Sequence, residues 1–117
     1  MQQIQIPPLA EGEIYVGVTG DKNGDSHHVI LLPGDNDEAT WQAQMDWAKL
    51  IGGDLPTRVE QAMLWANHRD QFRKEWYWSN ELDEDGWAWF QVFGGGGQLY
   101  DLQDDEFRAR AVRRLPL

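Results

Sequence analysis

The stretch EWYWSNELDEDGWAWFQVFGGGGQLYDLQDDEFRARAVRRL, residues 75–115, decides the fold. Runs of aromatic and β-branched residues bounded by glycine and acidic turns are typical of β-strands. We predict strands over residues 76–79, 87–93 and 107–115, with a short aromatic segment after the four glycines 94–97. The stretch holds four of the seven tryptophans, and its eight acidic residues between positions 81 and 106 have no lysine or arginine among them. The rest of the chain is expected to support this surface.

The residues before this stretch predict a short edge strand, a hairpin and two helices. Residues 2–9 alternate and end in Pro7-Pro8, which is typical of an edge strand because proline cannot donate to a central ladder. Residues 13–19 and 28–32 predict strands joined by an Asn23-Gly24 turn.

The two helices are indicated by their caps and by apolar residues at helical spacing. Thr40 is the expected N-cap of a helix over residues 41–51, which Gly52 ends. Thr57 and Glu60 form a capping box that opens a second helix running to about residue 69. The expected inner faces are Trp41, Met45, Ala48 and Ile51 in the first helix, and Val59, Ala62, Met63 and Ala66 in the second.

This order of strands, helices and strands predicts one α+β domain over residues 1–117, with an N-terminal strand and hairpin (1–38), two helices (39–70), and a sheet with ligand-face loops (75–115). The chain of 117 residues is long enough to bury a core without disulfides, and it contains no cysteine. The beginning of the chain lacks a signal-peptide pattern and no apolar run approaches a membrane span, so we expect a protein made in the cytoplasm.

The formal charge of −10 narrows the class of partner. Nucleic acids and anionic membranes require clustered lysine and arginine, so neither is expected to bind. A basic protein or a neutral polar ligand, such as a glycan, fits better, and simple solubility is the ordinary explanation of acidity. We expect Arg108, Arg110, Arg113 and Arg114 to pair with carboxylates and loop carbonyls rather than to form an anion site.

The sequence gives little support to enzymatic or metal chemistry, so we expect a non-enzyme with no cofactor and no metal site. Asp21, Asn23 and Asp25 resemble the start of a calcium loop, but the glycine and the glutamate that such a loop needs at its sixth and twelfth positions are absent. His27 and His28 are adjacent in a predicted strand, so they point to opposite faces and cannot chelate together.

An ordered set of short motifs resembles the Lcl C-terminal-type domain, a family of phage, prophage and bacterial proteins of mostly unassigned function. The motifs are Leu55-Pro56-Thr57-Arg58, Tyr77-Trp78-Ser79, Ala88-Trp89 with Phe93, and Arg110-Ala111-Val112-Arg113. The resemblance implies a C-type lectin-like fold, related to formylglycine-generating enzymes and retroelement variable proteins, in which two helices pack on a small twisted antiparallel sheet with a loop-rich C-terminal ligand face. The cysteines of formylglycine-generating enzymes and the calcium and sugar signatures of classical C-type lectins are absent, so neither activity is carried over.

The strand over residues 87–93 is apolar on both faces, so alternation does not show which face is buried. The family pattern retains Trp89 and Phe93, which favours a buried face containing both and an exposed Phe90. The alternative, that the tryptophans are simply core, stays open. The predicted ligand- or partner-binding residues are Glu81, Asp83, Glu84, Asp85, Trp87, Phe90, Gln98, Tyr100 and Asp101.

Three functions follow as hypotheses. The first is a phage- or prophage-encoded recognition module that uses the surface over residues 81–105, either free or as a virion or tail-associated subunit. The second is a small acidic cytoplasmic inhibitor that blocks a host defence or nucleic-acid-binding protein by imitating nucleic acid. The third is an interaction domain that forms homo-oligomers through its exposed aromatic residues.

Overall fold

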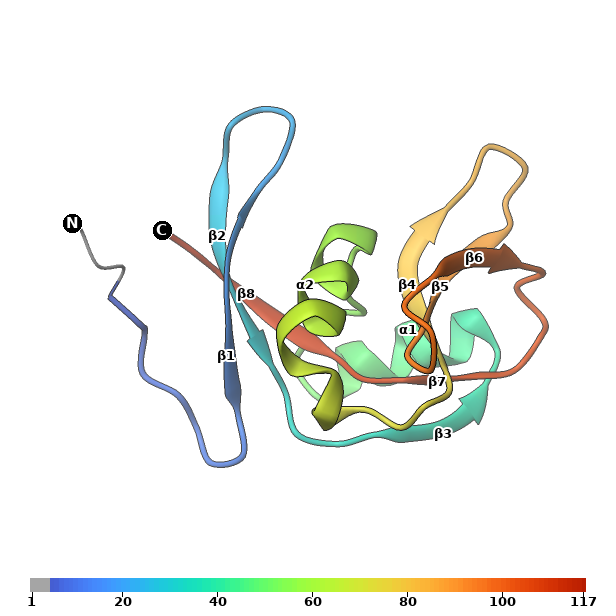
Figure 1. Cartoon of the computed structure of the whole chain (residues 1–117), viewed down its shortest axis with the longest axis horizontal. Helices are drawn as coiled ribbons and strands as arrows, with labels where there is room; N and C mark the ends of the chain where they lie inside the picture. The colour runs from blue at the N-terminus through green and yellow to red at the C-terminus, as the bar shows by residue number, and fades with distance from the viewer. Residues whose placement is uncertain (1–4) are drawn as a thin grey trace.

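The computed structural model describes residues 5–117, which form two sheets and two helices (Figure 1). The elements in chain order are β1 (Ile14–Gly20), β2 (Ser26–Leu31), β3 (Asn36–Ala39), α1 (Trp41–Leu50), α2 (Arg58–His68), a 3-10 turn η1 (Arg69–Gln71), β4 (Trp76–Leu82), β5 (Ala88–Val92), β6 (Gln98–Asp101), β7 (Phe107–Ala109) and β8 (Val112–Pro116). The α+β class is confirmed. No helix among these residues is long and apolar enough to cross a membrane.

The strands form two sheets where the sequence predicted one antiparallel sheet. The first has the order β1-β2-β8 and the second the order β3-β7-β4-β5-β6. The second sheet is mixed, because β4 and β7 pair in parallel through Tyr77 and Arg108. Helix α2 lies between the two sheets in Figure 1 and contacts β1 on one side and β4 and β5 on the other. Helix α1 contacts β3, β4 and β7.

The predicted strand over residues 107–115 is in fact two strands in different sheets. Strand β7 ends at Ala109, and β8 begins at Val112, where it pairs with β2. At the break, the carbonyl of Ala111 accepts a hydrogen bond from the amide of Leu32 (3.0 Å). The guanidinium of Arg110 donates to the carbonyls of Gln71 (2.7 Å) and Leu32 (2.8 Å). Alternation along a strand does not reveal such a change of partner, because it reports only which side chains are buried.

At the N-terminal end, the hairpin is confirmed and the edge strand is not. The amide of Gly24 donates to the carbonyl of Asp21 (3.1 Å), and Gly24 has a φ of +86°, which its lack of a side chain permits. Of the predicted strand over residues 2–9, positions 1–4 lie outside the described residues, and residues 5–9 form no strand. Pro7 and Pro8 remove two amide donors from this short segment, which leaves little of a ladder to form.

Both helix caps are confirmed, but the inner face of α2 differs from the prediction. Thr40 accepts from the amide of Ala43 (3.3 Å), and both hydrogen bonds of the Thr57–Glu60 capping box are present (2.8 and 3.1 Å). In α1, Trp41 and Ala48 are buried as expected and Met45 partly so, whereas Ile51 is exposed and Gln44 is buried instead. In α2, Val59, Ala62 and Ala66 are exposed, Met63 is partly buried, and the buried residues are Glu60, Gln61 and Leu64.

Polar residues of the helices are buried because both neighbouring sheets offer them partners. The side-chain amide of Gln61 donates to the carbonyls of Tyr77 (3.0 Å) and Trp78 (3.1 Å). Glu60 accepts two hydrogen bonds from Arg114 of β8, each 2.7 Å long. Burial alone would raise the pKa of Glu60, but the hydrogen bonds and charge of Arg114 lower it below its ordinary value. The helix therefore joins the two sheets through polar contacts that a hydrophobic pattern does not detect.

Helix α1 packs on one face of the second sheet and α2 on part of the other, and the burial of Phe90 on the α1 side overturns the prediction that it is exposed. Phe90 is only 2% exposed and packs with Trp78 and Phe107 in the cluster beside α1. Phe93 is buried, as predicted, in the cluster beside α2, while Trp89 remains partly exposed. Strand β5 is apolar on both faces because each face meets a helix-covered cluster.

The glycine run 94–97 contains one residue whose backbone a tryptophan approaches closely. Gly96 has a φ of +89°, and a Cβ at this position would lie 2.5 Å from the indole of Trp65. Gly95, its neighbour, has open space around the same position. The turn therefore requires glycine at position 96, whereas position 95 has room for a side chain.

We predict that Gly96→Ala lowers the free energy of unfolding by about 1–3 kcal/mol, because it introduces both a clash and a strained φ. Gly95→Ala is the matched control and is expected to change stability by less than about 0.5 kcal/mol. Urea denaturation of both variants measures the difference, and equal stabilities would contradict the close approach of Trp65.

The segment before β1 is attached to β8 by an ion pair. Glu13 accepts two hydrogen bonds from Arg113, each 2.8 Å long. These bonds, with a further one from the amide of Ala10, lower the pKa of Glu13 from 4.5 to about 2. Because this pKa is lower in the folded state, the carboxylate stabilises the fold above about pH 4.5, and the contribution disappears as the pH falls toward 2.

We therefore predict that Glu13→Gln makes the free energy of unfolding less dependent on pH between 4.5 and 2 than in the unchanged protein. The measurement is urea denaturation at a series of acidic pH values. Glu84→Gln, which removes one carboxylate at an exposed position outside this ion pair, serves as the control for the loss of a single charge. Parallel curves for Glu13→Gln and the unchanged protein would refute the role of this pair.

Candidate functional site

Three aromatic side chains form a partly exposed row. Trp87 immediately precedes β5, Trp89 lies in β5, and Tyr100 lies in β6. Trp87 and Tyr100 are 40% and 49% exposed, and their rings meet at 67° with centroids 5.6 Å apart. Tyr100 meets Trp89 at 71° and 4.9 Å. The guanidinium of Arg58 lies 3.5 Å from the centre of the Trp89 ring. We call Trp87, Tyr100, Trp89 and Arg58 the aromatic ladder.

Strand register and a helix start fix the position of the ladder. Trp89 and Tyr100 are opposite each other in the pairing of β5 with β6. Arg58 is the first residue of α2; its amide donates to Glu81 (2.7 Å), and its side chain donates to Gln98 (3.0 Å). Glu81 thus provides a negative charge and an acceptor at the N-terminus of α2, where both are favourable.

The two acidic loops, residues 83–86 and 101–106, lie side by side next to the ladder. The side-chain amide of Gln103 donates to the carbonyl of Gly86 and thereby joins them. Asp83 shapes the first loop, because its carboxylate accepts from the amides of Asp85 and Trp87 (both 2.9 Å). In the second loop, the neighbouring carboxyl of Asp101 raises the pKa of Asp105 through a shared hydrogen bond and like charge.

The structure brings together most of the predicted site residues but assigns several of them structural roles. Trp87 and Tyr100 lie exposed in the ladder, and Glu84 and Asp85 are exposed in the adjoining loop. The partly buried residues Glu81, Asp83, Gln98 and Asp101 hold Arg58 or the loop backbones. Phe90 is buried on the opposite face of β5, so its place in the site was wrong.

Two members of the ladder were missed by the sequence reasoning. Trp89 was assigned to the core from the family pattern, and Arg58 was noted only as part of a motif. The stacking of Arg58 on Trp89 joins two distant parts of the chain, and hydrophobic periodicity does not reveal such a contact. The exposed residues Asp104 and Asp105 belong to the predicted surface over residues 81–105 but not to the named binding residues, and Glu106 lies just beyond that surface.

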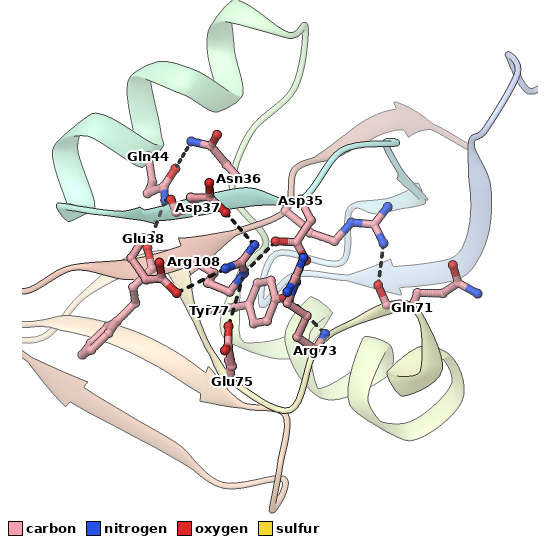
Figure 2. A network of polar contacts seen from close by, with 12 residues as sticks. Asp35, Asn36, Asp37, Glu38, Gln44, Gln71, Arg73, Glu75, Tyr77 and Arg108 are labelled. Carbon is pink, nitrogen blue, oxygen red and sulfur yellow. Dashed lines mark hydrogen bonds and ion pairs between the residues drawn. The ribbon is translucent and has the colours of Figure 1, made fainter.

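A second cluster of charges surrounds Arg108 of β7 (Figure 2). Its buried guanidinium contacts the carboxylates of Asp35 (2.8 Å), Asp37 (3.0 Å), Glu38 (3.2 Å) and Glu75 (3.4 Å). Asp35 also accepts a hydrogen bond from the hydroxyl of Tyr77. Burial, together with this bond to Asp35, raises the pKa of Tyr77 to about 12, so the phenol stays protonated and donates.

The aromatic ladder and the acidic loops present groups that can contact a ligand. The ladder offers stacking surfaces and the loops offer carboxylates, which are the groups that bind cationic or polar ligands. In the part of the chain that the structure describes, no group of three or more histidines and carboxylates is arranged to hold a metal ion. Comparisons of the chain with protein-family models, with curated proteins and with solved structures found no match.

We predict that Arg108→Met lowers the free energy of unfolding by about 2–3 kcal/mol, because it leaves several carboxylates close together without their shared cation. The partners are partly exposed, so the loss is smaller than for a fully buried pair. Glu75→Gln removes only the longest of these contacts and should cost less than about 1 kcal/mol. Equal urea midpoints for Arg108→Met and the unchanged protein would show that the cluster does not stabilise the fold.

Proposed function

We propose that the chain is a non-enzymatic recognition module that binds a protein or polar ligand through the aromatic ladder and the adjoining acidic loops. The observation that carries the proposal is the exposure of Trp87 and Tyr100 in edge-to-face contact beside two joined acidic loops. Partly exposed aromatic residues with an arginine, rimmed by polar groups, have the composition of binding hot spots.

The ladder is also pre-organised, which favours affinity. Arg58, Trp89 and Tyr100 are held by stacking and by hydrogen bonds before any ligand arrives. A partner that binds there immobilises few side chains, so less conformational entropy is lost. The two-helix α+β architecture is compatible with the C-type lectin-like fold that the sequence motifs imply, and this fold and a phage or prophage origin are parts of the proposal.

A second candidate function is favoured by the charge of the loops. Glu84, Asp85, Asp104, Asp105 and Glu106 are all exposed in the two joined acidic loops. A surface of this kind would suit a small acidic inhibitor that occupies the basic site of a nucleic-acid-binding protein. Salt separates the two candidates, because charge-driven binding weakens steeply as ionic strength rises, whereas aromatic stacking does not.

The test is capture by the tagged protein on intact bacterial cells and, separately, in a bacterial lysate, at low and at high salt. Trp87→Ala/Tyr100→Ala removes the exposed part of the ladder, and Asp104→Asn/Asp105→Asn/Glu106→Gln removes charge from the second loop. Leu50→Ala, an exposed apolar residue at the end of α1, is the control. Circular dichroism should show that all three variants fold, since each change is at the surface.

We expect the aromatic variant to lose at least about tenfold in binding, in line with the loss of two hot-spot side chains, with little change on raising the salt. Binding that survives the aromatic variant but disappears with the acidic variant or in high salt would favour the inhibitor. Binding that neither variant weakens, or that Leu50→Ala weakens equally, would place the interaction elsewhere and contradict the proposal.

A further inference from the structure

A pocket of about 280 Å³ lies at the beginning of β4, away from the aromatic ladder. Its lining consists of Glu38, Lys74, Glu75, Trp76, Phe107 and Arg108. Trp76 is the first residue of β4, whereas the acidic loops begin after the last residue of that strand. Trp76 packs against Phe90 and Phe107, which belong to the α1 side of the sheet, and the ladder is on the other face of β5. We call this place the Trp76 pocket.

The indole of Trp76 is supported by two aromatic rings and is still partly exposed. Its ring stacks on Phe90 with centroids 5.0 Å apart and meets Phe107 at 78° and 5.2 Å. The residue is nevertheless 44% exposed and lines the pocket, so part of the indole is accessible from it. A rigid indole backed by two aromatic rings is a suitable surface for a planar group or a cation.

The pocket lining has two carboxylates and two cations, but Arg108 contacts two further carboxylates outside the lining, so the charges around the pocket sum to a negative value. Asp35 and Asp37 make the two shortest contacts with the guanidinium of Arg108 (2.8 and 3.0 Å). Glu38 and Glu75 make the longer ones (3.2 and 3.4 Å), and their side chains are 51% and 48% exposed. Both line the pocket with oxygen atoms that a second cation could reach, and Lys74 is the pocket's other basic residue.

The same fold already places guanidinium groups on indoles at two other positions. Arg58 lies 3.5 Å above Trp89, and Arg69 lies 4.0 Å above Trp65. Among residues 5–117, no guanidinium lies over Trp76. The Trp76 pocket thus has an indole and nearby carboxylates, and its own cations, Lys74 and Arg108, do not stack on that indole.

We infer that the Trp76 pocket binds the guanidinium of an arginine side chain from a basic partner protein. The guanidinium would stack on the exposed part of the Trp76 indole and pair with Glu38 and Glu75. Arginine fits better than lysine because its guanidinium is planar and weakly hydrated, and because it forms bidentate bonds with carboxylates. The pocket is of a size for one side chain, being smaller than most pockets for drug-sized ligands.

The test follows the indole N–H signals of the seven tryptophans by NMR during titration with N-acetyl-L-arginine amide. Trp76→Phe identifies the Trp76 signal by its absence. N-acetyl-L-citrulline amide, which has nearly the same shape but no charge, is the control ligand. We expect a saturable shift of the Trp76 signal with a dissociation constant on the order of millimolar, and binding of the citrulline compound at least about fivefold weaker.

Matched variants locate the site. Glu38→Gln/Glu75→Gln should weaken arginine binding about threefold to tenfold, since two ion pairs are lost. Asp37→Asn/Glu84→Gln also removes two negative charges, and one of them, on Asp37, pairs with Arg108. Both residues are outside the pocket lining, so arginine binding should change less than about twofold. Trp87→Ala/Tyr100→Ala should leave the titration unchanged, so this test is independent of the aromatic ladder.

Three outcomes would overturn the inference. They are a Trp76 signal that does not move, equal binding of the arginine and citrulline compounds, and equal losses in the two charge-removing variants. Equal losses would mean that arginine binding depends on the net charge of the protein and not on Glu38 and Glu75 in particular.

Discussion

The arginines of residues 108–114 are the constraint on which the rest of the fold depends. Each donates to a different part of the chain: Arg108 to the carboxylates around β3, Arg110 to two loop carbonyls, Arg113 to Glu13, and Arg114 to Glu60 and Asp54. Arginine suits this task because its fixed fork of donors can satisfy several acceptors at once. One short segment thereby connects both sheets, α2 and the segment before β1.

This pairing divides the acidity of the chain into two kinds. The carboxylates of Glu13, Asp54 and Glu60 pair with Arg113 and Arg114 within the fold. Four carboxylates share the one guanidinium of Arg108, so that cluster keeps an excess of negative charge. The two acidic loops have no basic residue in the sequence between positions 81 and 106. The net charge of −10 is therefore distributed unevenly, because the segment between positions 81 and 106 has eight acidic residues and no basic one.

Local features of the fold could be predicted from the sequence, and non-local ones could not. The Asn23-Gly24 turn and the caps at Thr40 and Thr57 depend on neighbouring residues, so the pattern contains all that is needed. The expectation that the four arginines pair internally was also confirmed, because acids were abundant. The sequence does not show which carboxylate pairs with which arginine.

The errors share one physical cause, which is burial of both sides of an element. Strand β5 and helix α2 each contact neighbours on two sides, so apolar periodicity does not mark a single inner face. Phe90 was misplaced for this reason, and so were Val59 and Ala66. The sequence predicted two of the four ladder residues, Trp87 and Tyr100. It could not predict Arg58 and Trp89, because their contact depends on how α2 packs against β5.

The division of residues 107–116 between two sheets has a consequence for biosynthesis. Strand β7 separates β3 from β4 inside the second sheet, and β8 completes the first by pairing with β2. These pairings close long stretches of chain, a feature that slows folding. During translation both sheets remain incomplete until this segment leaves the ribosome, and Trp78, which is fully buried in the finished fold, lacks part of its covering until then. Over that interval the nascent chain exposes apolar surface that the finished fold buries, and such exposure favours aggregation.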